Sequence, residues 1–481
     1  MSSLRSGRVV IVAFVAIIAS TAHADEPPAP GQKSPETSSE PAVAAPAPTK
    51  PEPPKLPAPA LPAPAVTPIP IAGFRARGDT KVHDRMVGRL THLEIGDLIT
   101  PDKIPELEAA LLSSELFRTA SVTFEDAPDG VLVVAMLKDK MSWIAAPTVY
   151  VLPSSWSVGV GYAENNLLGE EKKLLLYGQI GNRTNLFFGT YLDPAVNGTK
   201  LQLRFDIYAY RRYVQEYLNP PSDPRSFEVG RETQQTFLDG GVLVGWRFYW
   251  WLVADFRLRG AYVFFRDAKA ADGSPLPVPQ TDGWDITTQE RITLDARKHL
   301  YGVTWGPYVQ ALVEPSVPGL DSYGYVVAAA RAYYSWRLFG EHELELRTGL
   351  GIGRHLPFHE ELAIGGVSDL RGYDVDQFRG DTRASFRVEY SVPIVKWKIF
   401  AFRALGFFDS GYVAYHFQDP SGARNYLPTE VNGAHWFRND FGGGLRIYVN
   451  NVVLPLLGLD YGYGLEGHSR ELYFEIGLTD F

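Results

Sequence analysis

Apolar and polar side chains alternate along several segments in the C-terminal two thirds of the chain. In residues 383–392, arginine, serine and glutamate occupy every second position, and alanine, phenylalanine, valine and tyrosine occupy the positions between them. Residues 200–207 and 341–350 show the same period of two. Because successive side chains of a β-strand point to opposite faces, this pattern predicts strands with one apolar and one charged face.

About sixteen such strands follow one another from residue 144 to residue 480. They are expected near 144–152, 154–163, 172–181, 185–193, 199–211, 234–248, 251–266, 284–297, 300–313, 322–336, 341–354, 380–393, 400–415, 438–449, 451–463 and 470–480.

The connectors between these strands differ systematically in length. Most connectors after odd-numbered strands are long, namely 212–233, 267–283, 314–321, 355–379 and 416–437, and most of the others are short turns. Long loops on one rim and short turns on the other are typical of an outer-membrane barrel, which turns its apolar face to lipid. A soluble sandwich would bury that face, and it gives no reason for sorting loops by length. Aromatic residues near strand ends suit interfacial girdles, with ordinary packing as the alternative: Trp246, Tyr249, Trp250, Trp251, Trp336 and Trp397.

A different pattern precedes the barrel, from about residue 67 to residue 140. Residues 69–77 read as a strand, residues 80–90 and 102–117 are helix-like, and two further strands meet at Pro128-Asp129-Gly130. The order β-α-α-β-β within roughly seventy-five residues predicts a small α/β domain.

The N-terminal residues have the features of an export signal. Arg5 and Arg8 precede an apolar run from Val9 to Ala19, and small residues end at Ala24, so residues 1–24 are expected to be removed. Residues 25–66 are rich in proline and alanine and predict an extended, disordered linker. Composition leaves open whether this linker is a semi-rigid spacer or a plain tail.

Charge and cysteine content narrow the function classes. The chain has no cysteine, which excludes a disulfide framework, a lipoprotein anchor and thiol chemistry. The formal charge of −9 becomes −11 without the two signal arginines, which gives no support for nucleic-acid binding. After residue 24, no stretch approaches the roughly 18 apolar residues of a membrane helix.

Several motifs occur in order along the chain after residue 67. The segment GGVSDLRGY, from Gly365 and Gly366 through Leu370, Arg371 and Gly372 to Tyr373, closely resembles the VRGF/Y motif of the BamA/TamA outer-membrane superfamily. Further resemblances are Asn166–Gly169 (N-x-L-G), Asp295 and Arg297 (D-x-R), FFDSG at 407–411 and the hairpin at 438–463. The end FEIGLTDF is similar to the closing signal of the family at Phe474, Ile476 and Gly477, but one extra residue puts the terminal Phe481 out of phase.

The resemblance implies a barrel whose sixth long loop folds back into the lumen, where Arg371 pairs with Asp409. A buried guanidinium needs a carboxylate, and its planar fork matches one through two hydrogen bonds. The alternative is an exposed glycine-rich turn with a solvated arginine. The resemblance also identifies residues 67–140 as a POTRA domain, the periplasmic module of the superfamily.

Enzyme chemistry finds little support in the sequence. His355 and His359 have the spacing of helical metal ligands, with Glu360 adjacent, but Pro357 and the loop context argue against a helix. The segment GVSDL at 366–370 lacks the last glycine of a nucleophile elbow. No catalytic residue, metal or cofactor is therefore expected.

The sequence as a whole predicts an all-β transmembrane barrel of about sixteen antiparallel strands at 141–481, preceded by a small α/β POTRA domain at 67–140. The expected function is insertion or assembly of outer-membrane proteins, or translocation of an exported polypeptide. A two-partner secretion pore and a passive diffusion pore are alternatives, and an outer-membrane hydrolase is a weaker one. Expected partners are outer-membrane lipid, unfolded client polypeptides and other periplasmic or inner-membrane assembly components, with the N-terminal region in the periplasm.

Overall fold

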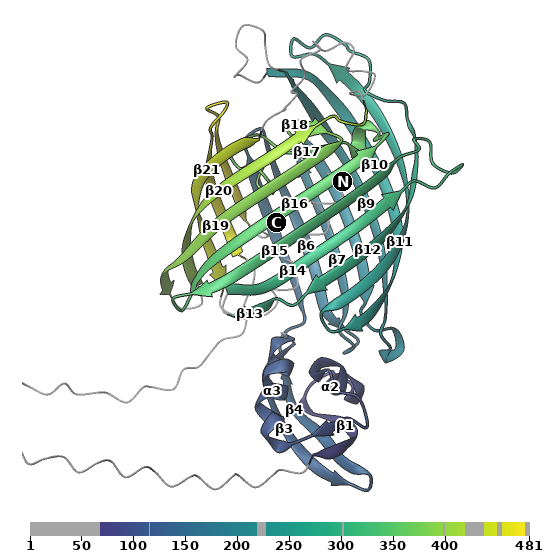
Figure 1. Ribbon diagram of the computed structural model, residues 1–481, viewed down its shortest axis with the longest axis vertical. Coiled ribbons are helices and arrows are strands. Elements are labelled where there is room, and N and C mark those ends of the chain that lie inside the picture. The colour runs from purple at the N-terminus through teal and green to yellow at the C-terminus, as the bar shows by residue number, and fades with distance from the viewer. Residues whose placement is uncertain are drawn as a thin grey trace, which may run out of the picture.

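The computed structural model describes residues 68–114, 116–218, 228–300, 303–397, 400–418, 437–449 and 455–476. These residues form a large β-barrel and a small α/β unit below it (Figure 1). The expected signal, the linker and the terminal residues Gly477 and Phe481 lie outside the described residues.

The α/β unit is a four-stranded sheet covered by two helices. Its elements are β1 (Ile69–Asp79), α2 (Asp84–Thr91), β2 (Leu98–Ile99), η1 (Pro101–Lys103), α3 (Ile104–Ser113), β3 (Phe117–Ala127) and β4 (Gly130–Asp139). The strand order is β2-β1-β4-β3, and β1 runs parallel to β4. The predicted β-α-α-β-β order is correct, with the two-residue β2 and the single turn η1 added. No helix in the described part of the chain is long and apolar enough to span a membrane.

Helix α2 packs closely on β1 because its sequence leaves room for the strand. Met86, Val87 and Leu90 are buried on the face that meets the sheet. Gly88 lies against the ring of Phe74, and a Cβ there would come within 2.5 Å of that ring. The helix ends at His92, whose left-handed backbone (φ 61°) lets the next amide donate to the carbonyl of Gly88.

Sixteen antiparallel strands close the barrel in the described part of the chain, with β12 and β13 counted as one. They are β5 (Trp143–Leu152), β6 (Ser155–Leu167), β7 (Lys172–Gly181), β8 (Thr184–Asp193), β9 (Leu201–Leu218), β10 (Glu228–Tyr249), β11 (Leu252–Lys269), β12 (Gly283–Asp295) with β13 (Lys298–Leu300), β14 (Val303–Pro315), β15 (Val326–Leu338), β16 (His342–Arg354), β19 (Thr382–Trp397), β20 (Phe400–Ala414), β21 (Arg438–Val449), β22 (Pro455–Gly464) and β23 (Arg470–Ile476). Both β12 and β13 pair with β14, so they form one barrel strand with an interruption. The predicted fold class and strand number are confirmed.

One expected loop is much shorter than its sequence suggests. The connector predicted at 212–233 spans only 219–227, because β9 and β10 continue as a long hairpin. Polar residues made this stretch look like a loop, but Arg231 is fully buried and its Nη2 donates to Glu216 at 2.7 Å. Ion pairs between inward-facing positions thus allow charged strands to continue beyond the predicted end.

The two faces of the barrel differ as predicted. Large apolar side chains such as Ile180, Leu258 and Leu350 are exposed on the outside, whereas charged side chains are buried within the lumen. Five of the six predicted girdle aromatics are exposed, and the sixth, Trp251, is half-buried and stacks on Tyr249 with ring centroids 5.3 Å apart. A lipid-facing apolar surface with a polar interior is the arrangement of a membrane barrel.

The two rims also differ. Short turns join β6 to β7 and β10 to β11 on the rim that faces the α/β unit, and the long connectors lie on the opposite rim (Figure 1). Helix α2 reaches the short-turn rim, where Arg85 pairs with Glu170, Arg89 pairs with Glu171 and His92 stacks on Trp250. The α/β unit is therefore attached to the barrel by side-chain contacts as well as by the chain.

Candidate functional site

The segment 355–381, here called the lumen loop, lies between β16 and β19. It contains η3 (Phe358–Glu360) and the short hairpin of β17 (Leu362–Ile364) and β18 (Phe378–Gly380), and most of its residues are buried. Gly365 and Gly366 reverse the chain after β17 with φ values of 125° and 88°, which only glycine adopts readily. A Cβ on Gly365 would lie 2.3 Å from the carbonyl oxygen of Asp374, so this turn also requires glycine for space.

Arg371 is the centre of the lumen loop. Its Nε and Nη2 donate to the two carboxylate oxygens of Asp409 at 2.9 and 3.1 Å, and its Nη1 donates to Glu389 at 2.7 Å. The guanidinium lies over the ring of Phe407, 3.4 Å from its centroid. Burial alone would lower the pKa of Arg371, but the carboxylates of Asp409 and Glu389 outweigh it and raise that pKa. The structure thus brings the two predicted motif residues together in a fully buried ion pair.

A larger network surrounds this pair. Arg387 donates to Asp409 at 3.0 Å, and Arg446 makes two hydrogen bonds of 2.7 Å with Asp460, which lies 3.7 Å from Arg371. Three guanidinium groups therefore alternate with carboxylates from β19, β20 and β22. Desolvated charges are tolerated only when compensated in this way.

Leu370, Gly372 and Tyr373 pack the same segment against the last strands. Leu370 and Tyr373 belong to a buried apolar cluster with Ile364, Phe378 and Val413. A Cβ on Gly372 would lie 2.5 Å from the amide nitrogen of Gly464, so the loop backbone touches β22 directly. The hydroxyl of Tyr373 donates to Glu466 at 2.5 Å, and the carbonyl oxygen of Asn439 lies 3.2 Å from the same hydroxyl.

The next residues of the lumen loop contact the first strands of the barrel. The Ser154 hydroxyl, in the turn after β5, donates to Asp374 at 2.9 Å, and the Tyr217 hydroxyl of β9 donates to the same carboxylate at 2.5 Å. Arg212 of β9 donates to Asp376 at 3.3 Å. These contacts were not predicted, because residues 212 and 217 were assigned to a loop.

The barrel closes between β23 and β5, a junction here called the seam. Three residue pairs join the two strands in the described part of the chain: Phe474 with Val151, Glu475 with Tyr150 and Ile476 with Val149. The other end of β23, Arg470 to Tyr473, pairs with β22 but has no described partner in β5. By comparison, ten pairs join β5 to β6. Among the described residues, the seam has the fewest residue pairs of any two neighbouring barrel strands.

A second buried cluster holds the beginning of the lumen loop. Asp285, His359 and Glu360 place possible metal-ligand atoms within 4.8 Å of one another. Arg259 already occupies this group, with Nη2 2.6 Å from Asp285 and Nη1 3.2 Å from Glu360. His355 is not a member, so the spacing noticed in the sequence is not the one that the fold uses. The arrangement can anchor the loop by charge, with a guanidinium in the place of a metal ion.

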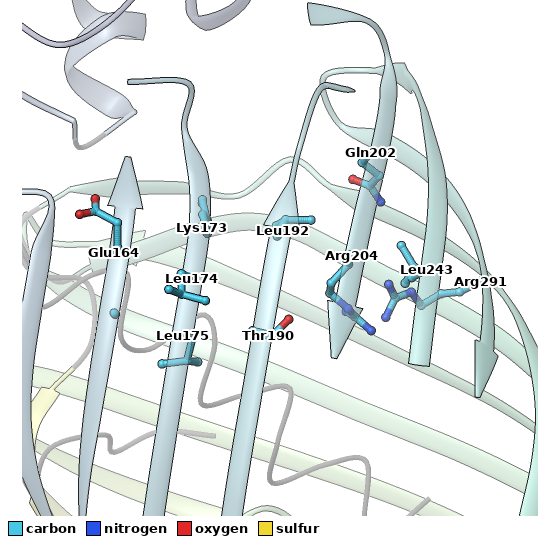
Figure 2. A pocket seen from close by; sticks show the side chains of 11 residues that line it. Glu164, Lys173, Leu174, Leu175, Thr190, Leu192, Gln202, Arg204, Leu243 and Arg291 are labelled. Atoms are coloured by element: carbon cyan, nitrogen blue, oxygen red, sulfur yellow. The ribbon is translucent and has the colours of Figure 1, made fainter. Parts of the chain in front are cut away.

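The described part of the lumen contains cavities, and two of them are defined by their lining residues. The smaller, of about 160 Å³, lies near the short-turn rim and is lined by Glu164, Lys173, Arg204 and Arg291 among others (Figure 2). The larger, of about 390 Å³, lies between the lumen loop and the wall and is lined by Tyr150, Tyr177 and Arg331 among others. The lumen is thus partly filled, with the loop as its main content.

The fold and the lumen loop define a membrane β-barrel whose interior is occupied by one of its own loops. Residues 166–479 match the Omp85 superfamily domain, and the chain belongs to this superfamily. The predicted family is thereby confirmed. At the level of the superfamily, this places the protein in the outer membrane, among barrels that insert or transport proteins without catalysis.

Solved structures show the same fold at low sequence identity. BamA from Haemophilus ducreyi lacking POTRA domains 1–3 is 13% identical with a TM-score of 0.56, and the match covers 84% of each chain. CdiB from Acinetobacter baumannii is 13% identical with a TM-score of 0.57, covering 85% of this chain and 74% of that chain. CdiB from Escherichia coli is 10% identical with a TM-score of 0.57, covering 84% and 76%. A comparison with curated proteins returns no match.

Proposed function

We propose that this protein inserts or assembles outer-membrane proteins by accepting a client strand at the seam between β23 and β5. The observation that carries the proposal is the short pairing there, with Arg470 to Tyr473 of β23 lacking a described partner in β5. In lipid, every backbone amide and carbonyl must be paired within the protein. A strand edge that its neighbour does not cover is therefore a template for a client strand, which supplies the missing hydrogen bonds. No nucleotide or metal is needed for such a step.

We also propose that the α/β unit is a periplasmic POTRA domain that receives unfolded clients. The match with the truncated BamA covers 84% of this chain, which is more than the barrel at 141–481 can supply. The structural similarity therefore extends into the α/β unit, which supports the proposal. The eleven-residue strand β3 is an edge of the sheet, where a client could add a strand once it displaces Glu108 of α3 from the amide of Val122. Because the unit lies at the short-turn rim, the turn side of the barrel would face the periplasm.

Translocation through the lumen is the second candidate function. It would require the lumen loop to leave, because the loop crosses the interior and is held there by the Arg371 network. A passive diffusion pore gives no role to a loop anchored by buried charges. Electrical conductance in planar bilayers separates these candidates, since only a pore passes ions while the seam stays shut.

A cross-link across the seam tests the proposal directly. Because the chain lacks cysteine, Val151→Cys with Phe474→Cys gives a single disulfide-forming pair at register partners. In liposomes that receive an unfolded outer-membrane client, oxidation should stop the appearance of folded client, and reduction should restore it. The matched control is Val158→Cys with Ile180→Cys, which joins β6 to β7 at another exposed register pair. Unchanged client folding in the oxidised seam variant would refute insertion at the seam.

A further inference from the structure

We propose that Asp374 and Asp376 of the lumen loop are the latch that holds the seam shut. In this arrangement the loop is a strap across the seam, attached to the last strands by residues 371–373 and to the first strands by the two aspartates. This inference rests on the proposed function, because it concerns how the same seam is regulated.

Two consecutive residues of the strap reach opposite sides of the seam. The Tyr473 hydroxyl of β23 donates to the carbonyl oxygen of Tyr373 at 2.5 Å. The following residue, Asp374, accepts a hydrogen bond from Ser154, between β5 and β6, at 2.9 Å. The path from Tyr473 to Ser154 therefore bridges the strands that the seam would separate, and it does so where β23 has no described partner in β5.

The attachment to the last strands is the stronger of the two. Arg371 is buried and shares four hydrogen bonds with Asp409 and Glu389, one of them from its backbone amide. The Ser469 hydroxyl also donates to the carbonyl of Gly372, whose backbone touches β22. Removing one partner of a buried charge network leaves other charges uncompensated, so this side resists separation.

The attachment to the first strands is weaker and easier to break. Asp374 and Asp376 are half-buried, and their described partners across the seam are two hydroxyl groups and one guanidinium, that of Arg212 at 3.3 Å. Water can replace these partners when the strands move apart, so their loss carries no large desolvation penalty. We therefore expect the strap to stay with β19 to β23 and to release β5 to β9 when the seam opens.

The distance across the seam can be measured in the complete protein. Spin labels on Phe187→Cys of β8 and Leu472→Cys of β23 would both face lipid, since both side chains are exposed. Four strand spacings of about 4.8 Å put the labelled positions on the order of 20 Å apart in the closed barrel. Pulsed electron paramagnetic resonance in liposomes then gives the fractions of molecules with short and with long distances between the two spin labels.

Replacing the latch with Asp374→Ala and Asp376→Ala should raise the ratio of long to short distances by roughly tenfold, as expected for the loss of two or three modest contacts. The matched control is Asp272→Ala, an exposed loop aspartate that accepts a hydrogen bond from the amide of Ser274 in its own turn. If the double variant fails to fold, Ser154→Ala with Arg212→Ala and Tyr217→Phe removes the same contacts from the barrel side. Distances equal to those of the Asp272→Ala control would overturn the latch.

Client insertion, measured in the same liposomes, separates the latch from the proposed function. A latch variant with longer distances and faster client folding supports both. Longer distances with unchanged client folding support the latch and contradict insertion at the seam. The third outcome overturns the latch alone. In it, the latch variant shows unchanged distances, while client folding by the seam disulfide variant still requires reduction of that disulfide.

Discussion

At the scale of single residues, Arg371 shows why a charged loop side chain is buried here. Its guanidinium has a flat fork that matches Asp409 and leaves Nη1 for Glu389, which a lysine ammonium cannot reproduce. We expect Arg371→Ala and Arg371→Lys both to lower the stability of the folded barrel, by about 3 to 5 kcal/mol for alanine. The shift in electrophoretic mobility between heated and unheated samples, followed across a urea series, measures this loss.

The control for Arg371 is another arginine in a surface ion pair. Arg266 is exposed and pairs with Asp282 at 2.8 Å, so Arg266→Ala should change stability by less than about 1 kcal/mol. Equal stability of the Arg371→Ala and Arg266→Ala proteins would contradict the anchoring role of the buried network.

The residue scale also marks the limit of prediction from the sequence. The Arg371–Asp409 pair was predictable because a motif resemblance named both residues, and alternation placed Glu389 on the charged face of its strand. The β9 partners of Asp374 and Asp376 were not predictable, since Tyr217 and Arg212 were assigned to a loop that the fold converts into strand. Asp285 lies 74 positions before His359, and no local pattern relates two residues so far apart.

At the scale of elements, the turn between β6 and β7 connects the barrel to helix α2. Gly169 in this turn has φ 71°, and a Cβ there would lie 2.0 Å from the carbonyl oxygen of Lys81. Glu170 and Glu171 follow it and pair with Arg85 and Arg89, respectively. The resemblance predicted an N-x-L-G turn here but not its contact with the α/β unit, because sequence patterns report local structure and not docking between domains.

Docking of helix α2 on the turn between β6 and β7 should depend on pH and on opposite charges at the paired positions. A hydrogen bond with Lys172 lowers the pKa of Glu170. Burial by itself would raise the pKa of Glu171, but the positive charges of Lys173 and Arg89 outweigh burial, so the pKa of Glu171 is lowered as well. Carboxylates with lowered pKa values stabilise docking fully above their ordinary pKa of about 4.3 and lose that effect as pH falls through the lowered values. Energy transfer between dyes on α2 and on the rim should therefore stay constant from pH 8 to about pH 5 and fall below it.

Exchanging the charges provides the control for the docking prediction. Arg89→Glu should reduce energy transfer at neutral pH, and adding Glu171→Arg should restore much of it, because the pair is then reversed and not lost. Because these side chains are partly exposed, the expected effect is small, about 0.2 to 1 kcal/mol. Equal energy transfer in all three proteins at pH 7 would contradict a role for the ion pair in docking.

At the scale of the whole molecule, the barrel is wide enough for a channel but is occupied by its own loop. Sixteen-stranded barrels leave an aqueous interior when nothing fills them. Here the lumen loop lies across the interior, anchored at Arg259 near its start and at Asp409 near its middle, and cavities of about 160 and 390 Å³ lie in the described part of the lumen. We therefore expect low and intermittent conductance from the native protein in planar bilayers.

Removing the strap should convert this barrel into an open pore. Replacement of residues 367–377 by a short glycine-serine linker deletes Arg371 and both latch aspartates, and steady channels with several-fold higher conductance are the expected result. Mobility on unheated gels must first show that the variant barrel is folded, because the same deletion removes the Asp409 partner. The matched variant shortens the connector between β11 and β12 within residues 270–274, where Asp272 contacts Ser274 in its own turn, and should leave conductance unchanged. Native conductance as high as that of the strap deletion would show that the lumen is already open, and it would favour a diffusion pore over a gated barrel.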